Sequence, residues 1–456
     1  MSSYTPHTAA DVAAMLAAIG GVASIDDLFA HIPAGLRARG AIDLPPGTTE
    51  PELRALMEGL AARNAAGQAG GVFLGAGAYP HWIPTLVDQL LLRSEFATAY
   101  TPYQPEVSQG TLQAVFEFQT FCATLLGLDV ANASMYDGAS AAAEAVLMAR
   151  RMRPERRTVW LARSLHPQYR HTVRTYLQAL ADVRVRELPF AADGRVELAP
   201  LAADLDDALC VVLGYPNVFG VLEDVAAVAR TAGTGTFTIT ATTEPLALAL
   251  VRSPGACGAD IAVAEGQSFG LPVSYGGPGV GLFATRERHV RSMPGRLVGE
   301  TVDVHGRRGF VLTLATREQH IRRERATSNI CTNQGLCALA VTVYLSLLGR
   351  HGLRRLAERN YQAAHAAAAR LEAAGVPRLV AGPFFNEFVV HAPAAVARWE
   401  ALAREGLVAG FPLERWYPEL EGALLVCLTE VHDAAAVDRL VAALAGGNAA
   451  AARETA

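Results

Sequence analysis

The 456-residue sequence contains no lysine, so all 39 residues counted as lysine plus arginine are arginines. Only an amine can form a Schiff base with an aldehyde cofactor, and lysine is the side chain that normally supplies it. The sequence therefore excludes an enzyme that holds such a cofactor covalently through a side chain of this chain.

Charged residues are also scarce, at 18%, while hydrophobic residues reach 51%, which excludes general disorder. The longest apolar tract runs over residues 336–348 and is interrupted by Thr342, Tyr344 and Ser346. It is shorter than the roughly 20 residues that a membrane helix needs. The N-terminus lacks the charged and continuously apolar regions of a signal peptide. We therefore predict a soluble, cytoplasmic protein with no membrane segment.

A net charge of −5 and a pI near 6.2 argue against nucleic-acid binding, which requires clustered cations. The basic stretch IRRER at residues 321–325 is an exception, and we interpret it as a solvated or salt-bridged helix end. The sequence has no CxxC motif and no Cys/His cluster with zinc spacing, so we expect no metal site. The six cysteines are predicted to be free thiols, at positions 122, 210, 257, 331, 337 and 427.

The first 95 residues are predicted to form a helical arm followed by an aromatic loop. Proline and glycine separate the expected helices Ala9 to Ile19, Ile25 to Phe29 and Glu50 to Ala66, and Thr48-Thr49-Glu50-Pro51-Glu52 is a helix-start signal. The following irregular chain is dense in aromatic residues, including Tyr79, Trp82 and Phe96. These side chains either line a ligand site or attach the arm to the next domain.

Residues 96–325 are predicted to form a large α/β domain, because short apolar runs alternate with helical segments. This pattern is typical of a mostly parallel sheet with helices on both faces, where ligands bind at the carboxyl ends of the strands. The expected strands are Ala131 to Met135, Thr158 to Leu161, Arg184 to Leu188, Leu209 to Leu213, Thr236 to Thr240, Asp260 to Val263 and Val280 to Ala284.

Residues 326–446 are predicted to form a smaller α+β domain. Two helices are expected first, over Gln334 to Leu348 and Leu353 to Ala374, and then strands over 385–392 and 423–429. Residues 447–456 show no core pattern, so we expect a flexible tail.

The most informative stretch of the sequence is Ala264 to Gly281, AEGQSFGLPVSYGGPGVG, because an expected strand, a turn and a glycine loop follow one another there. In aminotransferase-like pyridoxal-phosphate enzymes, a turn in this context carries the lysine of the Schiff base. Here the turn reads Gly266-Gln267-Ser268-Phe269.

Four stretches together resemble one family: FLGAGAYPHWIP (73–84), TAYTPYQPEVSQGTLQAVFEFQT (98–120), NASMYDGASAAAEA (132–145) and AEGQSFGLPVSYGGPG (264–279). They resemble glycine decarboxylase, the P-protein of the glycine cleavage system, in its N-terminal half or separate subunit 1. The resemblance covers nearly the whole chain and implies the pyridoxal-phosphate fold of type I.

In that family the lysine belongs to the second half or to subunit 2, and Gln267 takes the related place here. The resemblance implies that pyridoxal phosphate is held covalently by a partner subunit, in a heterodimer or a dimer of heterodimers. It also implies the reaction: glycine loses its carboxyl group as carbon dioxide, and the aminomethyl group passes to the lipoyl arm of the H-protein.

Family resemblance also directs attention to single residues. Asp137 to Ser140 opens a helix at the loop that holds the cofactor phosphate in active relatives, although we favour a plain capped helix. His166 stands where several pyridoxal enzymes have a histidine that stacks on the ring, and a helix-initiating turn explains it equally well. Near Thr243-Glu244-Pro245, we find no aspartate for the ring nitrogen.

The aromatic loop Ala99 to Ser108 is predicted to reach the partner's cofactor through Tyr100 and Tyr103. A second candidate for the same phosphate comprises Ser274, Tyr275, Gly276 and Gly277. The remaining predicted substrate or interface residues are Gln104, Glu106, Asp137, His166 and Asn329.

Two alternatives remain. The pattern GxGxxA at residues 279–284 is a weak signal for a dinucleotide site, because apolar residues follow it at strand period. It would fit a nucleotide-dependent oxidoreductase. The other alternative is a regulatory pseudoenzyme with the same fold. The family resemblance favours a required subunit of the decarboxylase.

Overall fold

The computed structural model describes residues 6–37, 43–64, 71–330 and 332–454, with side-chain surroundings as far as residue 446. The chain divides into two compact units, Met1–Asn64 and Ala65–Ala456. Each unit is considered by itself.

The first unit contains α1 (Ala9–Ile19), the 3-10 helix η1 (Ile25–Phe29) and α2 (Glu50–Ala61). α1 begins at Thr8, whose side chain accepts a hydrogen bond from the Asp11 N–H while the Asp11 carboxylate accepts one from the Thr8 N–H. None of the residues in these three helices is buried. All three predicted helices are therefore present, although α2 ends at Ala61; residues 65–66 of the expected helix lie outside the described residues.

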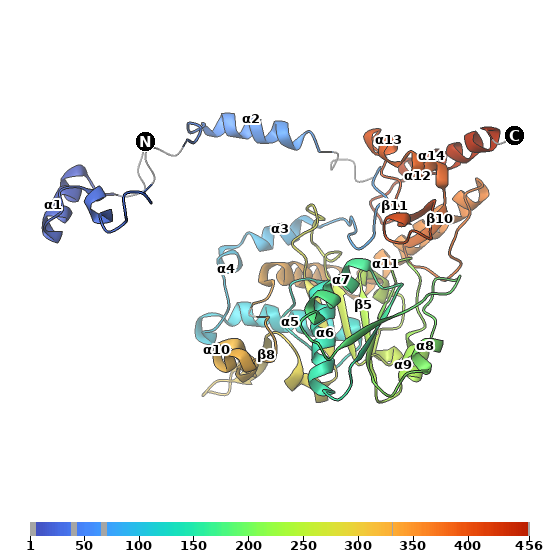
Figure 1. The fold of residues 1–456 in the computed structure, drawn as a ribbon, viewed down its shortest axis with the longest axis horizontal. Helices are drawn as coiled ribbons and strands as arrows, with labels where there is room; N and C mark the ends of the chain where they lie inside the picture. Colours follow the sequence, from blue (N-terminus) through green and yellow to red (C-terminus); the bar gives the residue numbers. More distant parts are fainter. Residues whose placement is uncertain (1–5, 38–42, 65–70, 331, 455–456) are drawn as a thin grey trace. The chain divides into compact units, whose positions relative to one another are not determined.

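The second unit is built on a seven-stranded sheet with the order β1-β7-β6-β5-β4-β2-β3. Its strand β5 is labelled in Figure 1. β2 to β6 run parallel to one another, and β7 is antiparallel to both of its neighbours. The strands are β1 (Val130–Ala131), β2 (Thr158–Ala162), β3 (Arg184–Leu188), β4 (Ala208–Gly214), β5 (Phe237–Thr242), β6 (Ile261–Glu265) and β7 (Gly281–Thr285).

Every residue of β2, β4, β5, β6 and β7 is buried. Because successive side chains of a strand point to opposite faces, burial at every position requires cover on both faces. α6 (Gly138–Met152) packs against β4 to β7 and against α7 (Pro167–Leu177), while α5 (Gln109–Leu126) packs against β1 and β7. The predicted sheet with two covered faces is confirmed.

The larger part of the second unit, which contains the seven-stranded sheet, also has several short helices. They are α3 (Thr85–Leu91), α4 (Ser94–Ala97), η4 (Pro105–Val107), α8 (Ala199–Ala202), α9 (Val225–Ala232), η5 (Pro245–Ala249), η6 (Gly255–Cys257), η7 (Glu287–Ser292), η8 (Ala315–Arg317), α10 (Gln319–Arg322) and η9 (Arg323–Arg325). A hairpin of β8 (Leu297–Val302) and β9 (Arg308–Thr313) was not predicted.

The C-terminal part has its own sheet, β10-β12-β11, and its own hydrophobic cluster around Phe73, Leu371 and Leu440. Its elements are β10 (Glu387–His391), α12 (Pro393–Ala397), α13 (Trp399–Arg404), β11 (Phe411–Pro412), η10 (Leu413–Arg415), β12 (Ala423–Cys427) and α14 (Ala434–Glu454). The helix α14 continues to Glu454, into the segment predicted to be a flexible tail.

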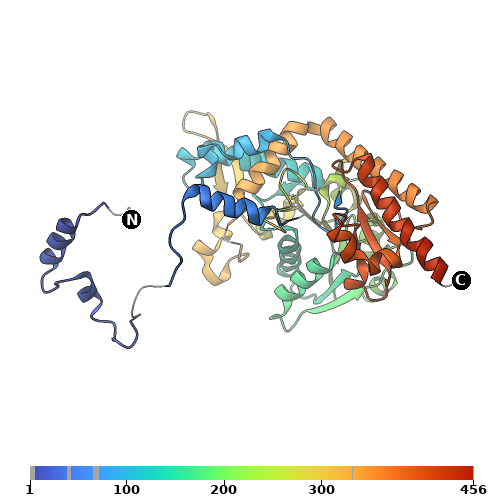
Figure 2. The same cartoon turned by 90° about the horizontal axis from the view of Figure 1, so that it is seen from above.

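The long helix α11 (Gly335–Ala373) joins the two parts, and in Figure 2 it lies beside α14. Its backbone is non-helical at Gly349, with φ 59° and ψ −176°, so the two predicted helices are one element with a kink. Residues before the kink, such as Tyr344, belong to the core of the large part, whereas Ala364 and Leu371 belong to the C-terminal cluster. The two cores therefore divide within α11, while a boundary at residue 326 was expected.

By length and composition α11 could cross a membrane, but half of its most apolar window is buried inside the protein. Such burial is typical of the core helix of a soluble protein. The helix therefore gives no positive indication of a membrane span.

Candidate functional site

Gln267 lies in the turn after β6 and is 7% exposed. Its side-chain oxygen accepts a hydrogen bond from the Tyr79 N–H at 2.8 Å, and its Nε2 donates to the carbonyls of Tyr79 at 3.0 Å and Leu271 at 2.8 Å. With these three bonds, the buried amide makes most of the hydrogen bonds that it is able to form. Gln267 therefore fastens the segment around Tyr79 over the carboxyl end of the sheet.

Glu265, the last residue of β6, directs its carboxylate at the first turn of α6. Oε2 accepts from the Gly138 N–H at 2.9 Å, and Oε1 accepts from the N–H groups of Val280 at 2.9 Å and Gln267 at 3.2 Å. The first N–H groups of a helix have no partner within the helix and lie at its positive end, so they favour an anion. An internal carboxylate occupies this position in the chain.

Burial raises the pKa of Glu265 to about 7, against the effect of its backbone N–H partners. The like charge of Asp137 acts in the same direction as burial. Asp137 itself caps α6, because its Oδ1 accepts from the Ser140 N–H at 2.6 Å.

His166 lies directly beneath the segment Ala76-Gly77. Its Nδ1 accepts from the Gln168 N–H at 3.2 Å, so Nε2 carries the proton and donates to the Ala76 carbonyl at 3.0 Å. Burial lowers the pKa of His166 to about 4, which keeps the ring neutral. A Cβ on Gly77 would lie 3.0 Å from Nε2, so no space separates the ring from the backbone above it.

Tyr79 links this segment to a buried acid. Its hydroxyl donates to Glu387 Oε2 at 2.8 Å and lies 3.1 Å from Thr243 Oγ1, while Glu387 Oε1 accepts from the Ala76 N–H at 2.7 Å. Burial raises the pKa of Glu387 to about 7, although both hydrogen bonds oppose the rise.

His81 bridges two acids at the end of the same segment. Its ring nitrogens lie 3.0 Å from Glu244 Oε2 and 2.9 Å from Glu430 Oε2. Burial opposes charge on the ring, but the two carboxylates outweigh it and raise the pKa of His81 to about 10. The imidazolium therefore bridges Glu244 and Glu430, and Glu244 lies where a ring-binding acid was sought in the sequence.

Tyr100 and Tyr103 lie on the surface loop before α5. Tyr100 is 82% exposed, and no hydrogen-bond partner for its hydroxyl is found among the residues that the structure describes. Tyr103 accepts a hydrogen bond from Arg296 Nη2 at 2.8 Å, and the Arg296 guanidinium also lies over the Tyr103 ring, 5.3 Å from its centre. The two predicted tyrosines therefore differ, because Tyr103 is held in place and Tyr100 is free to contact another molecule.

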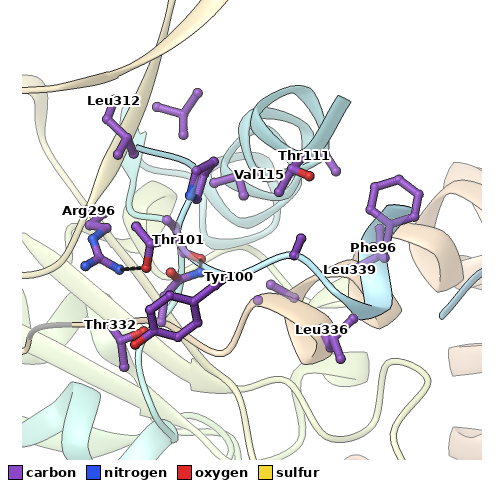
Figure 3. A pocket seen from close by; sticks show the side chains of 18 residues that line it. Phe96, Tyr100, Thr101, Thr111, Val115, Arg296, Leu312, Thr332, Leu336 and Leu339 are labelled. Atoms are coloured by element: carbon purple, nitrogen blue, oxygen red, sulfur yellow. Dashed lines mark hydrogen bonds between the residues drawn. The ribbon is translucent and has the colours of Figure 1, made fainter. Parts of the chain in front are cut away.

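A small pocket of about 120 Å³ lies beside this loop. Figure 3 shows Arg296 and Thr101, joined by a hydrogen bond of 3.1 Å, near Tyr100 and Thr332, with the apolar side chains of Phe96 and Leu336 farther along. Arg296 is buried and also lies 3.4 Å from Glu318. The pocket therefore has a fixed cation at one end and apolar walls at the other.

The glycine loop is the second exposed segment. Ser274 and Tyr275 both have positive φ, at 40° and 58°, and Tyr275 is 85% exposed. Gly276 and Gly277 follow them at the tip of the loop. The loop presents the Tyr275 side chain outward.

The other predicted residues lie apart from the buried cluster. Gln104, Glu106 and Asn329 are exposed, and Asn329 accepts a hydrogen bond from Gln319 at 3.1 Å. In the IRRER stretch, Arg325 and Glu324 form an exposed pair at 3.9 Å, as expected for a solvated helix end. Residues 281–284 belong to strand β7, so the GxGxxA pattern does not open a helix.

Five cysteines are free thiols, and Cys331 lies outside the described residues. Among the described ranges, no three His, Cys, Asp or Glu side chains gather in a way that could hold a metal.

Known proteins are similar to this chain along nearly its whole length. The family model for "Glycine cleavage system P-protein" matches residues 2–444. The chain belongs to this family. A relative from Anaeromyxobacter dehalogenans (strain 2CP-C), named "Probable glycine dehydrogenase (decarboxylating) subunit 1", is 54% identical over 436 residues, which cover 94% of this chain and 96% of the relative. A relative of the same name from Geobacillus kaustophilus (strain HTA426) is 49% identical and covers 98% and 99%.

A solved structure, "Crystal structure of glycine decarboxylase (P-protein) of the glycine cleavage system, in inhibitor-bound form", superposes with a TM-score of 0.88 at 44% identity, covering 98% of this chain and 100% of that one. Sphingosine-1-phosphate lyase from Burkholderia pseudomallei K96243 superposes with a TM-score of 0.65 at 16% identity, covering 93% and 97%, which indicates the fold alone. The predicted family and the predicted fold of type I are confirmed, and the fold supports pyridoxal phosphate as the cofactor of the activity.

The cofactor position implied by the fold does not fit pyridoxal phosphate in this P-protein chain. Glu265 fills the anion site at α6, the backbone of Ala76 and Gly77 covers His166, and Gln267 is bonded to Tyr79. Each of these positions is occupied by a group of the chain itself.

Several residues of this candidate site were not singled out in the sequence, among them Glu265, Arg296 and Glu387. Glu265 carried a usable signal, because a carboxylate ends a strand that is otherwise wholly apolar. Arg296 and Glu387 carried none, since Arg296 bonds to Thr101 across 195 residues and Glu387 to Ala76 across 311.

Proposed function

We propose that this P-protein chain completes the active site of a partner subunit, which bears the lysine and holds pyridoxal phosphate. Together the two subunits decarboxylate glycine and transfer its aminomethyl group to the lipoyl arm of the H-protein. The observation that carries the proposal is the contrast between a closed internal cofactor position and two exposed tyrosine loops. We place the pair in the cytoplasm.

The chain's own residues have a supporting part in this scheme. Arg296 bonds to both Thr101 and Tyr103, and proline fixes φ at positions 102 and 105. The loop is therefore rigid before any partner binds, and the exposed Tyr100 hydroxyl can be positioned with little loss of conformational entropy. Glu265 anchors the glycine loop at its far end through the Val280 N–H.

The second unit also carries large apolar side chains that are exposed. Trp82, Leu92 and Val107 are 71%, 75% and 80% exposed. Exposed apolar and aromatic groups of this size favour a protein interface, and the two tyrosine loops contribute to it. Docking of subunit 2 over this surface would also exclude water from the shared site.

The test is reconstitution from separately purified subunits. We expect exchange of the glycine carboxyl group with labelled bicarbonate, in the presence of lipoylated H-protein, only when both subunits are mixed. Full exchange by subunit 2 alone would contradict the proposal. A change in exchange rate without a requirement for this chain would instead support a regulatory pseudoenzyme.

A further inference from the structure

Glu265 is 8% exposed, and its carboxylate accepts hydrogen bonds from three backbone N–H groups. These N–H groups belong to three separate segments: the start of α6, the turn after β6, and the end of the glycine loop. Gly279 lies so close that a Cβ there would be 3.0 Å from one carboxylate oxygen and 3.1 Å from the other. The surroundings of the carboxylate are therefore fully packed.

We propose that the carboxylate of Glu265 substitutes internally for the cofactor phosphate at the N-terminus of α6, and so keeps the cofactor position of this chain closed. The 15-residue helix provides the positive end, and the Gly138 N–H points at Oε2. An anion held by backbone N–H groups at this place is what a phosphate would require.

A separate observation supports closure. The space above His166 is taken by the backbone of Ala76 and Gly77, which is fixed by Glu387 and, through Tyr79, by Gln267. Phosphate position and ring position are thus filled by residues from different parts of the sequence. Among the described residues, Asp137, Tyr169 and Cys337 interact electrostatically with Glu265, and none of these three side chains is a cation.

Removing the side chain should turn the internal anion site into an open one. Glu265→Ala deletes a carboxymethyl group and leaves three N–H donors without an acceptor. Acetate has the size and charge of the deleted group. The isosteric Glu265→Gln removes the charge but leaves no space, which makes it a matched control.

The experiment follows thermal unfolding of the full chain at pH 8, above the Glu265 pKa of about 7. We expect Glu265→Ala to unfold at a lower temperature than the wild type, because it leaves the three N–H groups without their acceptor. Sodium acetate should raise the midpoint of Glu265→Ala saturably, by about 2 °C or more over sodium chloride at equal ionic strength. Acetate should leave Glu265→Gln and the wild type unchanged, and neutral acetamide should not replace it.

Equal rescue by acetamide would overturn the proposal, because the site would then need volume rather than charge. A saturable rise in the wild-type midpoint with inorganic phosphate or pyridoxal 5′-phosphate would also overturn it, since the position would be open. If Glu265→Ala folds only in acetate, the proposal is supported. If it folds in neither salt, the proposal fails. The measurement needs no partner subunit, so it is independent of the proposed pairing.

Discussion

The side-chain amide of Gln267 forms two hydrogen bonds with the backbone of Tyr79, one to its N–H at 2.8 Å and one to its carbonyl at 3.0 Å. A peptide group in a neighbouring strand would offer the same pair of contacts. We infer that this turn, which corresponds by resemblance to the lysine-bearing turn of pyridoxal-phosphate enzymes, serves in this chain to fix the segment around Tyr79. This change of role explains why restoring the lysine alone should not restore the chemistry.

Gln267→Lys should yield no borohydride-stable adduct with pyridoxal phosphate on residue 267. The ammonium would be buried, the phosphate position would still be filled by Glu265, and the ring position would still be filled by Ala76 and Gly77. Peptide mapping after reduction checks this result, with the α-amino group excluded. The wild-type chain should likewise show no side-chain adduct, because it has no lysine. Recovery of a modified peptide containing residue 267 would show that the position is open.

Sedimentation of the chain co-expressed with subunit 2 should reveal a stable heterodimer or a dimer of heterodimers. Permanent interfaces commonly bury thousands of Å², and exposed side chains such as Trp82 and Val107 supply apolar surface for one. Cofactor content should be one pyridoxal phosphate for each pair of chains. Independent migration at micromolar concentration, or two cofactors for each pair, would contradict this arrangement.

The raised pKa of Glu387 makes folding stability depend on pH. Burial raises this pKa from 4.5 to about 7, so the folded protein binds a proton that the unfolded chain has released. The contribution is fully present below pH 4.5 and is lost as pH rises through 7, at most on the order of 3 kcal/mol. Glu387→Gln should flatten the decrease in stability between these two pH values.

Denaturant unfolding at pH 5 and pH 7.5 checks this dependence. The Gln variant can still accept the bond from the Ala76 N–H, so its fold should persist. Replacement of the exposed Glu405 by Gln serves as the control and should leave the slope unchanged. An identical slope in the wild type and Glu387→Gln would assign the dependence to other groups, with Glu265 the next candidate because its pKa is also raised to about 7.

Buried strands were the most predictable part of the fold. β3 has the limits expected from the sequence, Arg184–Leu188. The limits of β2, β4, β5, β6 and β7 differ from the expected ones by no more than two residues at either end. The β8–β9 hairpin was missed because its tip is exposed at Thr301 and Val302 and so breaks the apolar pattern. The expected strand over 131–135 is mostly irregular, with Met135 joined to Gly281 by a single bridge.

The candidate site was predictable only where local sequence decides the structure. Gln267 could be placed from the strand and turn around it. The contacts that close the site could not be predicted in this way. Glu265 is hydrogen-bonded to Gly138, which is 127 residues away in the sequence, and Tyr79 to Glu387, which is 308 residues away. Such pairs depend on how the strands are ordered in the sheet, which periodicity along the chain does not specify.

The tyrosine loop provides the last prediction. Tyr100→Phe should weaken cofactor retention or glycine–carbon dioxide exchange in the assembled pair by about tenfold or more, because a hydrogen bond to a charged group contributes roughly 1.5–3 kcal/mol. Tyr103→Phe should act indirectly, since its hydroxyl is bonded to Arg296 at 2.8 Å. Its effect should therefore be accompanied by a lower unfolding temperature of this chain, whereas Tyr100→Phe should leave that temperature unchanged.

Exchange kinetics and bound pyridoxal phosphate, measured on heterodimers of confirmed stoichiometry, distinguish the two roles. Tyr275→Phe tests the glycine loop in the same assay, because that side chain is exposed as well. If all three variants keep exchange and cofactor affinity within about twofold of the wild type, the loops contribute only surface to the interface. A loss confined to Tyr100→Phe would assign the hydroxyl that reaches the partner's site, because the fixed Tyr103 would then be its support.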